Sequence, residues 1–233
     1  MDPTRLDEAS LEETFAAPAA SSLRTGRVTM DDVVMRTANL FAVLVAVGAF
    51  AWGANNPALA LVGFLGGFVL AMVNIFSKKV RVPLIVAYAA AQGLALGTIS
   101  RIYNEAYSGI VGQAVIGTLC AFGGILLAYR SGKIRVTPKF TRILLGSLMG
   151  YFVFAIITMF TGFPGGTTGL LIAVAGVALA TFFLVLDFDQ IERTIAAGAP
   201  QEESWRMAFG LMVTIVWLYM EVLRLISILR SGD

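Results

Sequence analysis

Seven apolar stretches of about twenty residues, separated by short polar breaks, constrain this chain more than any other feature. A bilayer core about 30 Å thick needs roughly 20 apolar residues per helix. Helix-breaking residues fall at the breaks, at Asn56-Pro57, Pro83 and residues 162–166. The pattern predicts an all-α, polytopic membrane protein with a seven-helix transmembrane domain over residues 31–233. We expect its helices near residues 33–53, 58–77, 83–103, 109–129, 141–161, 168–190 and 206–229.

The composition agrees with a chain that lies mostly in lipid. Of the 233 residues 58% are hydrophobic and only 14% are charged, whereas a soluble domain carries about 25% charged residues. The net charge is only +2 and the basic residues are spread over loops, so nucleic-acid binding is not expected. Histidine is missing and Cys120 is the single cysteine, which excludes histidine-dependent catalysis and a disulfide within one chain. We expect neither an enzyme nor a bound cofactor.

The loop charges predict how the helices are oriented. Residues 1–30 are polar and are predicted to form a disordered cytoplasmic tail. Basic residues gather in this tail and in the ranges 78–81 and 130–139, while the alternate loops are nearly uncharged apart from Arg101 and Glu105. The positive-inside rule then places the N-terminus in the cytoplasm and, after seven crossings, the C-terminus outside.

Four ionisable residues of the last two segments are the strongest functional signal. They are Asp187, Asp189, Glu221 and Arg224. A charge at the centre of a membrane helix costs about 2.5 to 3.5 kcal/mol on insertion scales, so such residues usually face a bundle interior and mark an ion or proton pathway. Asp187 and Asp189 are two positions apart and point about 200° away from each other on a helix. We expect Asp187 to face inward and Asp189 to be a cap or surface partner.

Glu221 and Arg224 form an i,i+3 pair on the last helix, close to the face that carries Thr214 and Leu218. Such a pair can neutralise itself and fix helix register without any transport role. Alternatively, an inward carboxylate can bind Ca²⁺, a hard cation that takes oxygen ligands, or a proton. Asp187 and Glu221 are therefore the candidate metal and proton ligands, and Ca²⁺ or protons the candidate transported ions.

Glycine spacing predicts close helix packing. Gly93 and Gly97, and likewise Gly146 and Gly150, have the small-xxx-small spacing that lets two helix backbones approach. We expect both pairs to be packing positions.

Four motifs resemble the Bax inhibitor-1 family, in particular its bacterial YccA-like branch. They are YAAAQGLALGTISRIY at 88–103, GIVGQAVIGT at 109–118, LDFDQIE at 186–192 and AFGLMVTIVWLYMEVLRLI at 208–226. The resemblance implies six helices around a central, hydrophobic seventh helix and location in the bacterial inner membrane. It also implies a pH-sensitive calcium leak controlled by one aspartate on helix six and one on helix seven.

The resemblance carries over to this chain residue by residue, and only in part. Asp187 matches the helix-six aspartate and Arg224 matches the helix-seven arginine. Thr214 occupies the position of the second aspartate, so the two-aspartate sensor is incomplete in this chain. Glu221 could replace that aspartate in a shifted geometry, or supply the acidic partner of Arg224.

Two functional hypotheses follow. The first is a pH-responsive calcium leak channel gated by Asp187, with Glu221 and Arg224 as a lock. The second is a non-transporting regulator that binds another membrane protein, such as a quality-control protease, through residues 1–30. A coupled secondary transporter usually shows inverted repeats, and this sequence shows none.

Overall fold

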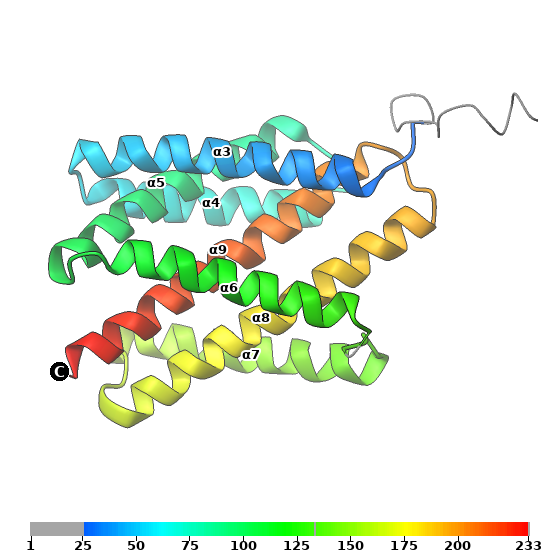
Figure 1. The fold of residues 1–233 in the computed structure, drawn as a ribbon. Helices are drawn as coiled ribbons and strands as arrows, with labels where there is room; N and C mark the ends of the chain where they lie inside the picture. The colour runs from blue at the N-terminus through cyan, green and yellow to red at the C-terminus, as the bar shows by residue number, and fades with distance from the viewer. Residues whose placement is uncertain (1–25, 133, 233) are drawn as a thin grey trace, which may run out of the picture.

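The computed structural model describes residues 26–132 and 134–232, which form seven helices. They are labelled α3 to α9 in Figure 1. Their bounds are Met30–Ala54 (α3), Ala58–Phe76 (α4), Val82–Ala106 (α5), Ile110–Arg130 (α6), Pro138–Thr161 (α7), Gly166–Ala196 (α8) and Glu203–Ser231 (α9). All seven are long and apolar enough to cross a membrane. The predicted all-α seven-helix architecture is confirmed.

Local sequence signals explain where the helices begin and end. Thr29 caps α3 through a reciprocal capping box with Asp32, which satisfies free backbone donors of the first turn. Asn55 ends the same helix in the left-handed conformation at φ 49°. Thr137 accepts a hydrogen bond from the backbone of Phe140 and so caps α7. The last two helices, at 31 and 29 residues, extend beyond the apolar segments because their polar ends continue the helical hydrogen bonding.

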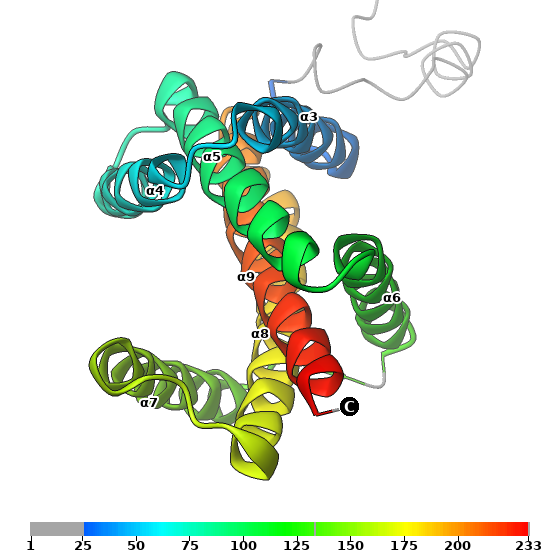
Figure 2. The same cartoon turned by 90° about the vertical axis from the view of Figure 1, so that its left-hand side faces the viewer.

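Helix α9 runs through the middle of the bundle. It packs against α3, α5, α6 and α8, as Figure 2 shows in a view along the helices. Helix α4 packs mainly on α5, and α7 mainly on α8. The expected central seventh helix is present, but a complete ring of six helices around it is not. The physical reason is that α4 and α7 are coated with large apolar side chains that remain exposed in the protein and suit contact with lipid.

The α3–α5 crossing depends on glycine. A Cβ atom at Gly93 would lie 2.6 Å from the carbonyl oxygen of Leu44, and one at Gly97 would overlap the backbone of Gly48. The first predicted glycine pair is therefore a close backbone contact. At Gly146 and Gly150, in contrast, a Cβ atom would meet no described atom within 4 Å. The packing expectation for that second pair is wrong, because no described helix comes into contact distance of either position.

The two glycine pairs make a matched test of the crossing. Gly97→Ala should lower the free energy of unfolding by about 1 to 3 kcal/mol, since overpacked sites cost that much. Gly146→Ala should be neutral or stabilising by up to about 1 kcal/mol, because alanine is the better helix former. Thermal unfolding of both variants in detergent measures the difference. Equal melting temperatures would contradict a close α3–α5 contact.

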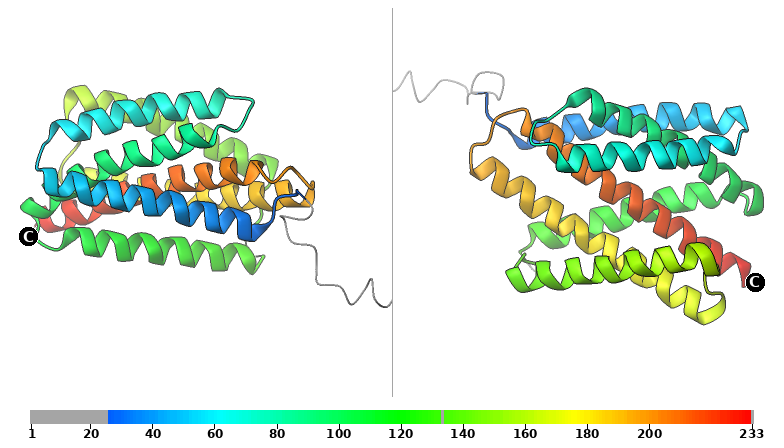
Figure 3. Two further views of the ribbon diagram at one scale, coloured as in Figure 1. Left: turned by 90° about the horizontal axis from the view of Figure 1, so that it is seen from above. Right: turned by 180° about the vertical axis from the view of Figure 1, so that it is seen from behind.

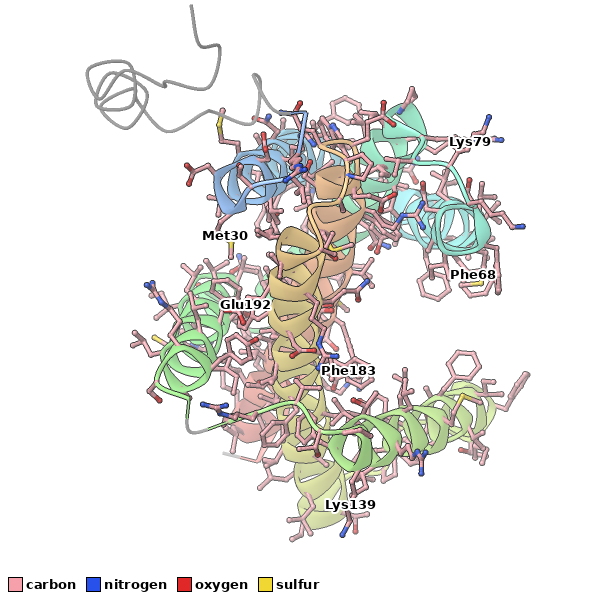
Figure 4. All side chains as sticks on the ribbon, turned by 90° about the vertical axis from the view of Figure 1, so that its right-hand side faces the viewer. Met30, Phe68, Lys79, Lys139, Phe183 and Glu192 are labelled. Atoms are coloured by element: carbon pink, nitrogen blue, oxygen red, sulfur yellow. The ribbon has the colours of Figure 1, made fainter. Side chains whose placement is uncertain are left out.

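One end of the bundle is basic. Here α3, α5, α7 and α9 begin and α4, α6 and α8 end, and we call it the basic end. Its described basic residues are Arg27, Arg36, Lys78, Lys79, Arg81, Arg130, Arg135, Lys139, Arg142, Arg193 and Arg206. Figure 4 looks at the bundle from this end, with Lys79 and Lys139 near opposite edges. At the other end, Arg101 is paired with Glu105 at 2.7 Å.

The segment before α3 is attached to the loop between α8 and α9, as the views in Figure 3 show. Val28 donates a backbone hydrogen bond to Ala199 at 2.9 Å, and Gln201 donates one to Gly26 at 2.9 Å. Val28 is buried. The expected tail comprises residues 1–30, of which residues 1–25 lie outside the described residues. Gly26 and Val28, near the end of this segment, form the contact.

Candidate functional site

Helices α8 and α9 form an antiparallel pair that carries all the predicted site residues. On α8 a row of small residues is buried at a spacing of three or four positions: Gly169, Ala173, Gly176 and Ala180. Such a row lets another helix approach closely. At Gly176 the approach is so close that an added Cβ atom would lie 2.5 Å from the Glu221 Oε2 atom. This spacing is visible in the sequence, although only the pairs Gly93/Gly97 and Gly146/Gly150 were predicted as packing positions.

Asp187 faces α9 at the level of Gly210 and Thr214. Its side chain is hydrogen-bonded to Thr214, and a Cβ atom at Gly210 would lie 3.7 Å from its Oδ1 atom. The Gly210 carbonyl oxygen, 3.3 Å from the Thr214 hydroxyl, is the alternative acceptor for its single proton. The second oxygen of Asp187, Oδ2, is buried without a hydrogen-bond partner in the described part of the chain. A buried, unpartnered carboxylate oxygen is costly and is a place where a proton or cation can bind.

Asp189 has a different environment on the same helix. Its Oδ2 atom forms an ion pair with the Arg193 Nε atom at 2.6 Å, one turn further along α8. The Arg193 side chain is 70% exposed, so this pair lies on the outside of the bundle. Asp187 and Asp189 thus point to different surroundings, as their two-residue spacing requires.

Glu221 and Arg224 form the second polar group of the hairpin. The Glu221 side chain is only 3% exposed and its Oε2 atom lies 3.1 Å from the Arg224 Nη1 atom. Trp217 donates its indole N–H to the Oε1 atom of Glu221 at 3.1 Å. Arg224 also donates to the Tyr151 hydroxyl of α7 at 3.0 Å, and its guanidinium lies 4.9 Å from the centre of the Phe163 ring. A buried carboxylate is thereby neutralised and hydrogen-bonded.

A cavity of about 650 Å³ lies beside this ion pair, between α7 and the second half of α9. Its walls include Glu221, Arg224, Trp217, Tyr151 and Phe163. The ion pair therefore lies at the wall of a cavity rather than inside solid packing.

An apolar layer separates the two polar groups. Gly176, which touches Glu221, precedes Asp187 by eleven positions on α8, or about 16 Å along the helix. Between the two levels lie Ala180, Leu184 and Leu218, each 0% exposed. We call these three residues the apolar layer. The structure brings Asp187 to Thr214 and Glu221 to Arg224, but it does not bring Asp187 to Glu221.

The two candidate metal and proton ligands, Asp187 and Glu221, therefore lie at different levels of the hairpin. Glu221 is occupied by Arg224 and Trp217 at another level of the hairpin. Within residues 26–132 and 134–232, no three histidine, cysteine or acidic side chains come close enough to hold a metal ion together. The side-chain partner of Asp187 is instead Thr214, and Gly210 leaves room beside its Oδ1 atom.

Sequence reasoning missed three members of the Glu221 group. Trp217 precedes Glu221 by four residues, so one turn of helix periodicity could have found it. Gly176 belongs to the small-residue row of α8, which is also visible in the sequence. Tyr151 carries no such signal, because it comes from α7 and only the tertiary packing places it beside Arg224.

Seven apolar helices with buried charged side chains on the last two define a multi-pass membrane protein. A family model described as Bax inhibitor 1 like matches residues 7–231. The chain therefore belongs to the Bax inhibitor 1 like family, which confirms the resemblance found in its motifs. No curated protein sequence matches the chain.

Proposed function

We propose that this protein is a pH-responsive cation leak pathway with calcium as its ion and Asp187 as its proton-sensitive gate. The observation that carries the proposal is the Oδ2 atom of Asp187, which is buried between α8 and α9 without a partner in the described residues. A proton and a cation compete for this oxygen. Protonation removes both the negative charge and the ligand that a cation would use.

The layers of the α8–α9 hairpin support a gated path. On one side of the apolar layer lies Asp187, and on the other lies the cavity beside Glu221 and Arg224. Hydrophobic constrictions can gate a pathway by excluding water. In the proposed mechanism the apolar layer is the closed gate, and a change of charge at Asp187 alters the α8–α9 contact that closes it. The Glu221–Arg224 pair locks α9 to α7 through Tyr151.

Calcium suits the oxygen atoms around Asp187. Ca²⁺ takes about six to eight oxygen ligands from carboxylates, carbonyls, hydroxyls and water. Asp187 supplies up to two, the Thr214 hydroxyl is its neighbour, and water would supply the rest. Because Thr214 stands where the family resemblance expects a second aspartate, we infer that a single carboxylate titrates here instead of a coupled pair.

We further propose that the protein lies in the bacterial inner membrane with its basic end in the cytoplasm. The concentration of basic residues at that end supports this orientation. The N-terminus is then cytoplasmic and the C-terminus outside. Asp187 lies towards the cytoplasm, and the cavity beside Glu221 lies towards the outside.

Reconstitution of the full chain into liposomes with an entrapped calcium dye tests the proposed function. Calcium uptake should exceed that of protein-free liposomes and should change with pH. A variant that lacks residues 1–25 should keep this flux, because the seven membrane helices and the proposed gate at Asp187 lie outside that segment. A full-length protein without calcium flux at any pH would contradict the channel. Loss of binding to a partner membrane protein in the truncated variant, with no flux in either, would favour the regulator hypothesis.

A further inference from the structure

A second cavity lies at the basic end, away from Asp187 and Glu221. Its volume is about 600 Å³, and it is formed where α3, α5 and α9 begin. Arg36 of α3 and Arg81 before α5 line it together with Gln201, Glu202 and Trp205 around the start of α9. This cavity plays no part in the proposed cation path.

Arg36 is held in place by the start of α9. Its Nη1 atom donates a hydrogen bond to the Gln201 carbonyl oxygen, and its guanidinium lies 5.3 Å from the centre of the Trp205 ring. A guanidinium has five N–H donors in a fixed plane, and in the described chain Arg36 uses one of them. Arg36 is thus positioned in advance, with donors left for an anion.

Arg81 is the second cation of this cavity. It is exposed and precedes the first residue of α5. Across the described ranges its side chain forms no hydrogen bond or ion pair. The ion pairs found there belong to four other arginines: Arg101, Arg193, Arg206 and Arg224. Neither arginine forms an ion pair in the described ranges, and both line one cavity. Guanidinium groups bind phosphate by paired hydrogen bonds.

The place of the cavity in the fold indicates where the phosphate comes from. Basic pockets between transmembrane helices bind the head groups of anionic lipids. Tryptophan is enriched at the level of lipid head groups, and Trp205 forms one wall of this cavity. Val80, Val82 and Leu84 add apolar lining. We propose that this cavity binds the phosphate head group of an anionic phospholipid through Arg36 and Arg81.

Glu202 gives the proposal an internal control. This exposed carboxylate lines the same cavity and opposes an anion. Removing its charge should therefore strengthen binding, whereas removing either arginine should weaken it. A general loss of stability would weaken lipid binding in all three variants, and so would not strengthen it in the Glu202 variant alone.

The test uses the full chain in an uncharged detergent and native mass spectrometry with short-chain phosphatidylglycerol. We expect one lipid to bind saturably, with phosphatidylcholine binding much more weakly. Arg36→Gln and Arg81→Gln should each lower the affinity about fivefold, as expected for one basic residue near an anionic lipid, and Glu202→Gln should raise it by a similar factor. Arg135→Gln, at the same end but outside the cavity, should leave it unchanged.

Three results would overturn the proposal. The first is equal affinity for phosphatidylglycerol and phosphatidylcholine. The second is unchanged affinity in the Arg81→Gln variant, whose side chain supports no contact of the described fold and whose folding is checked by thermal unfolding. The third is displacement of the lipid by inorganic phosphate at the same concentration, which would assign the cavity to free phosphate.

Discussion

Asp187→Asn should abolish the pH dependence of calcium flux in liposomes. The amide keeps the size of the carboxyl group but neither titrates nor carries a charge. One titrating group changes its ratio of charged to neutral form about tenfold per pH unit, so wild-type flux should change by up to about that factor per unit. In the variant, flux at mildly acidic and mildly alkaline pH should be the same.

Two control variants separate Asp187 from its surroundings. Asp189→Asn removes a charge two residues away that is paired with Arg193 outside the bundle, and it should keep the wild-type pH response. Thr214→Val replaces the hydroxyl group that is hydrogen-bonded to Asp187 by a methyl group. Calcium flux in this variant should still respond to pH, but with its midpoint at a different pH. An Asp187→Asn variant whose flux still follows pH as in the wild type would refute the proposed gate.

Arg224→Gln should destabilise the bundle by about 3 to 5 kcal/mol, because removing one partner of a buried ion pair leaves the other charge uncompensated. The remaining charge, on Glu221, is nearly inaccessible at 3% exposure. Glu221→Gln should cost less, since the Arg224 side chain is 32% exposed and faces the cavity. Unfolding in a denaturing detergent, followed by tryptophan fluorescence, measures both variants.

The double variant Glu221→Gln/Arg224→Gln decides whether the pair acts as a unit. It should be more stable than Arg224→Gln alone, because the cluster then holds no charge and its amides can still hydrogen-bond. Tyr151→Phe removes the hydroxyl group that accepts a hydrogen bond from Arg224 and should cost about 1 kcal/mol. Additive losses in the double variant would mean that the two side chains do not form a coupled lock.

The helices were predictable because each one must satisfy its own backbone in lipid. All seven predicted segments overlap the observed ones, and Pro83 and the Asn56-Pro57 step fall where the breaks were expected. The boundaries of α8 and α9 were set too short, since hydropathy alone stops at Gln190 although the polar turn that follows remains helical. Gly97 was recognised as a packing residue, but Gly146 has the same spacing and no neighbour. Spacing shows that a helix can be approached, and only the fold decides whether another helix is there.

The members of the site were predictable, but their grouping was not. Asp187 and Glu221 stood out because an ionisable side chain within a membrane helix is costly and therefore usually has a function. Their partners depend on the register of α8 against α9, which the small-residue row of α8 sets by packing. A sequence holds no direct record of that register, so Tyr151 and the cavity beside Arg224 could not be foreseen.

By itself the sequence determined a multi-pass helical membrane protein of the Bax inhibitor 1 like family and placed its charges on the last two helices. These properties depend on local hydropathy and motifs, which each segment carries alone. Only the tertiary structure decided that Asp187 meets Thr214, that Arg224 neutralises Glu221 and that an apolar layer keeps the two levels apart. Contacts between helices depend on the depth and rotation at which they pack, and these arise only when all the helices pack together.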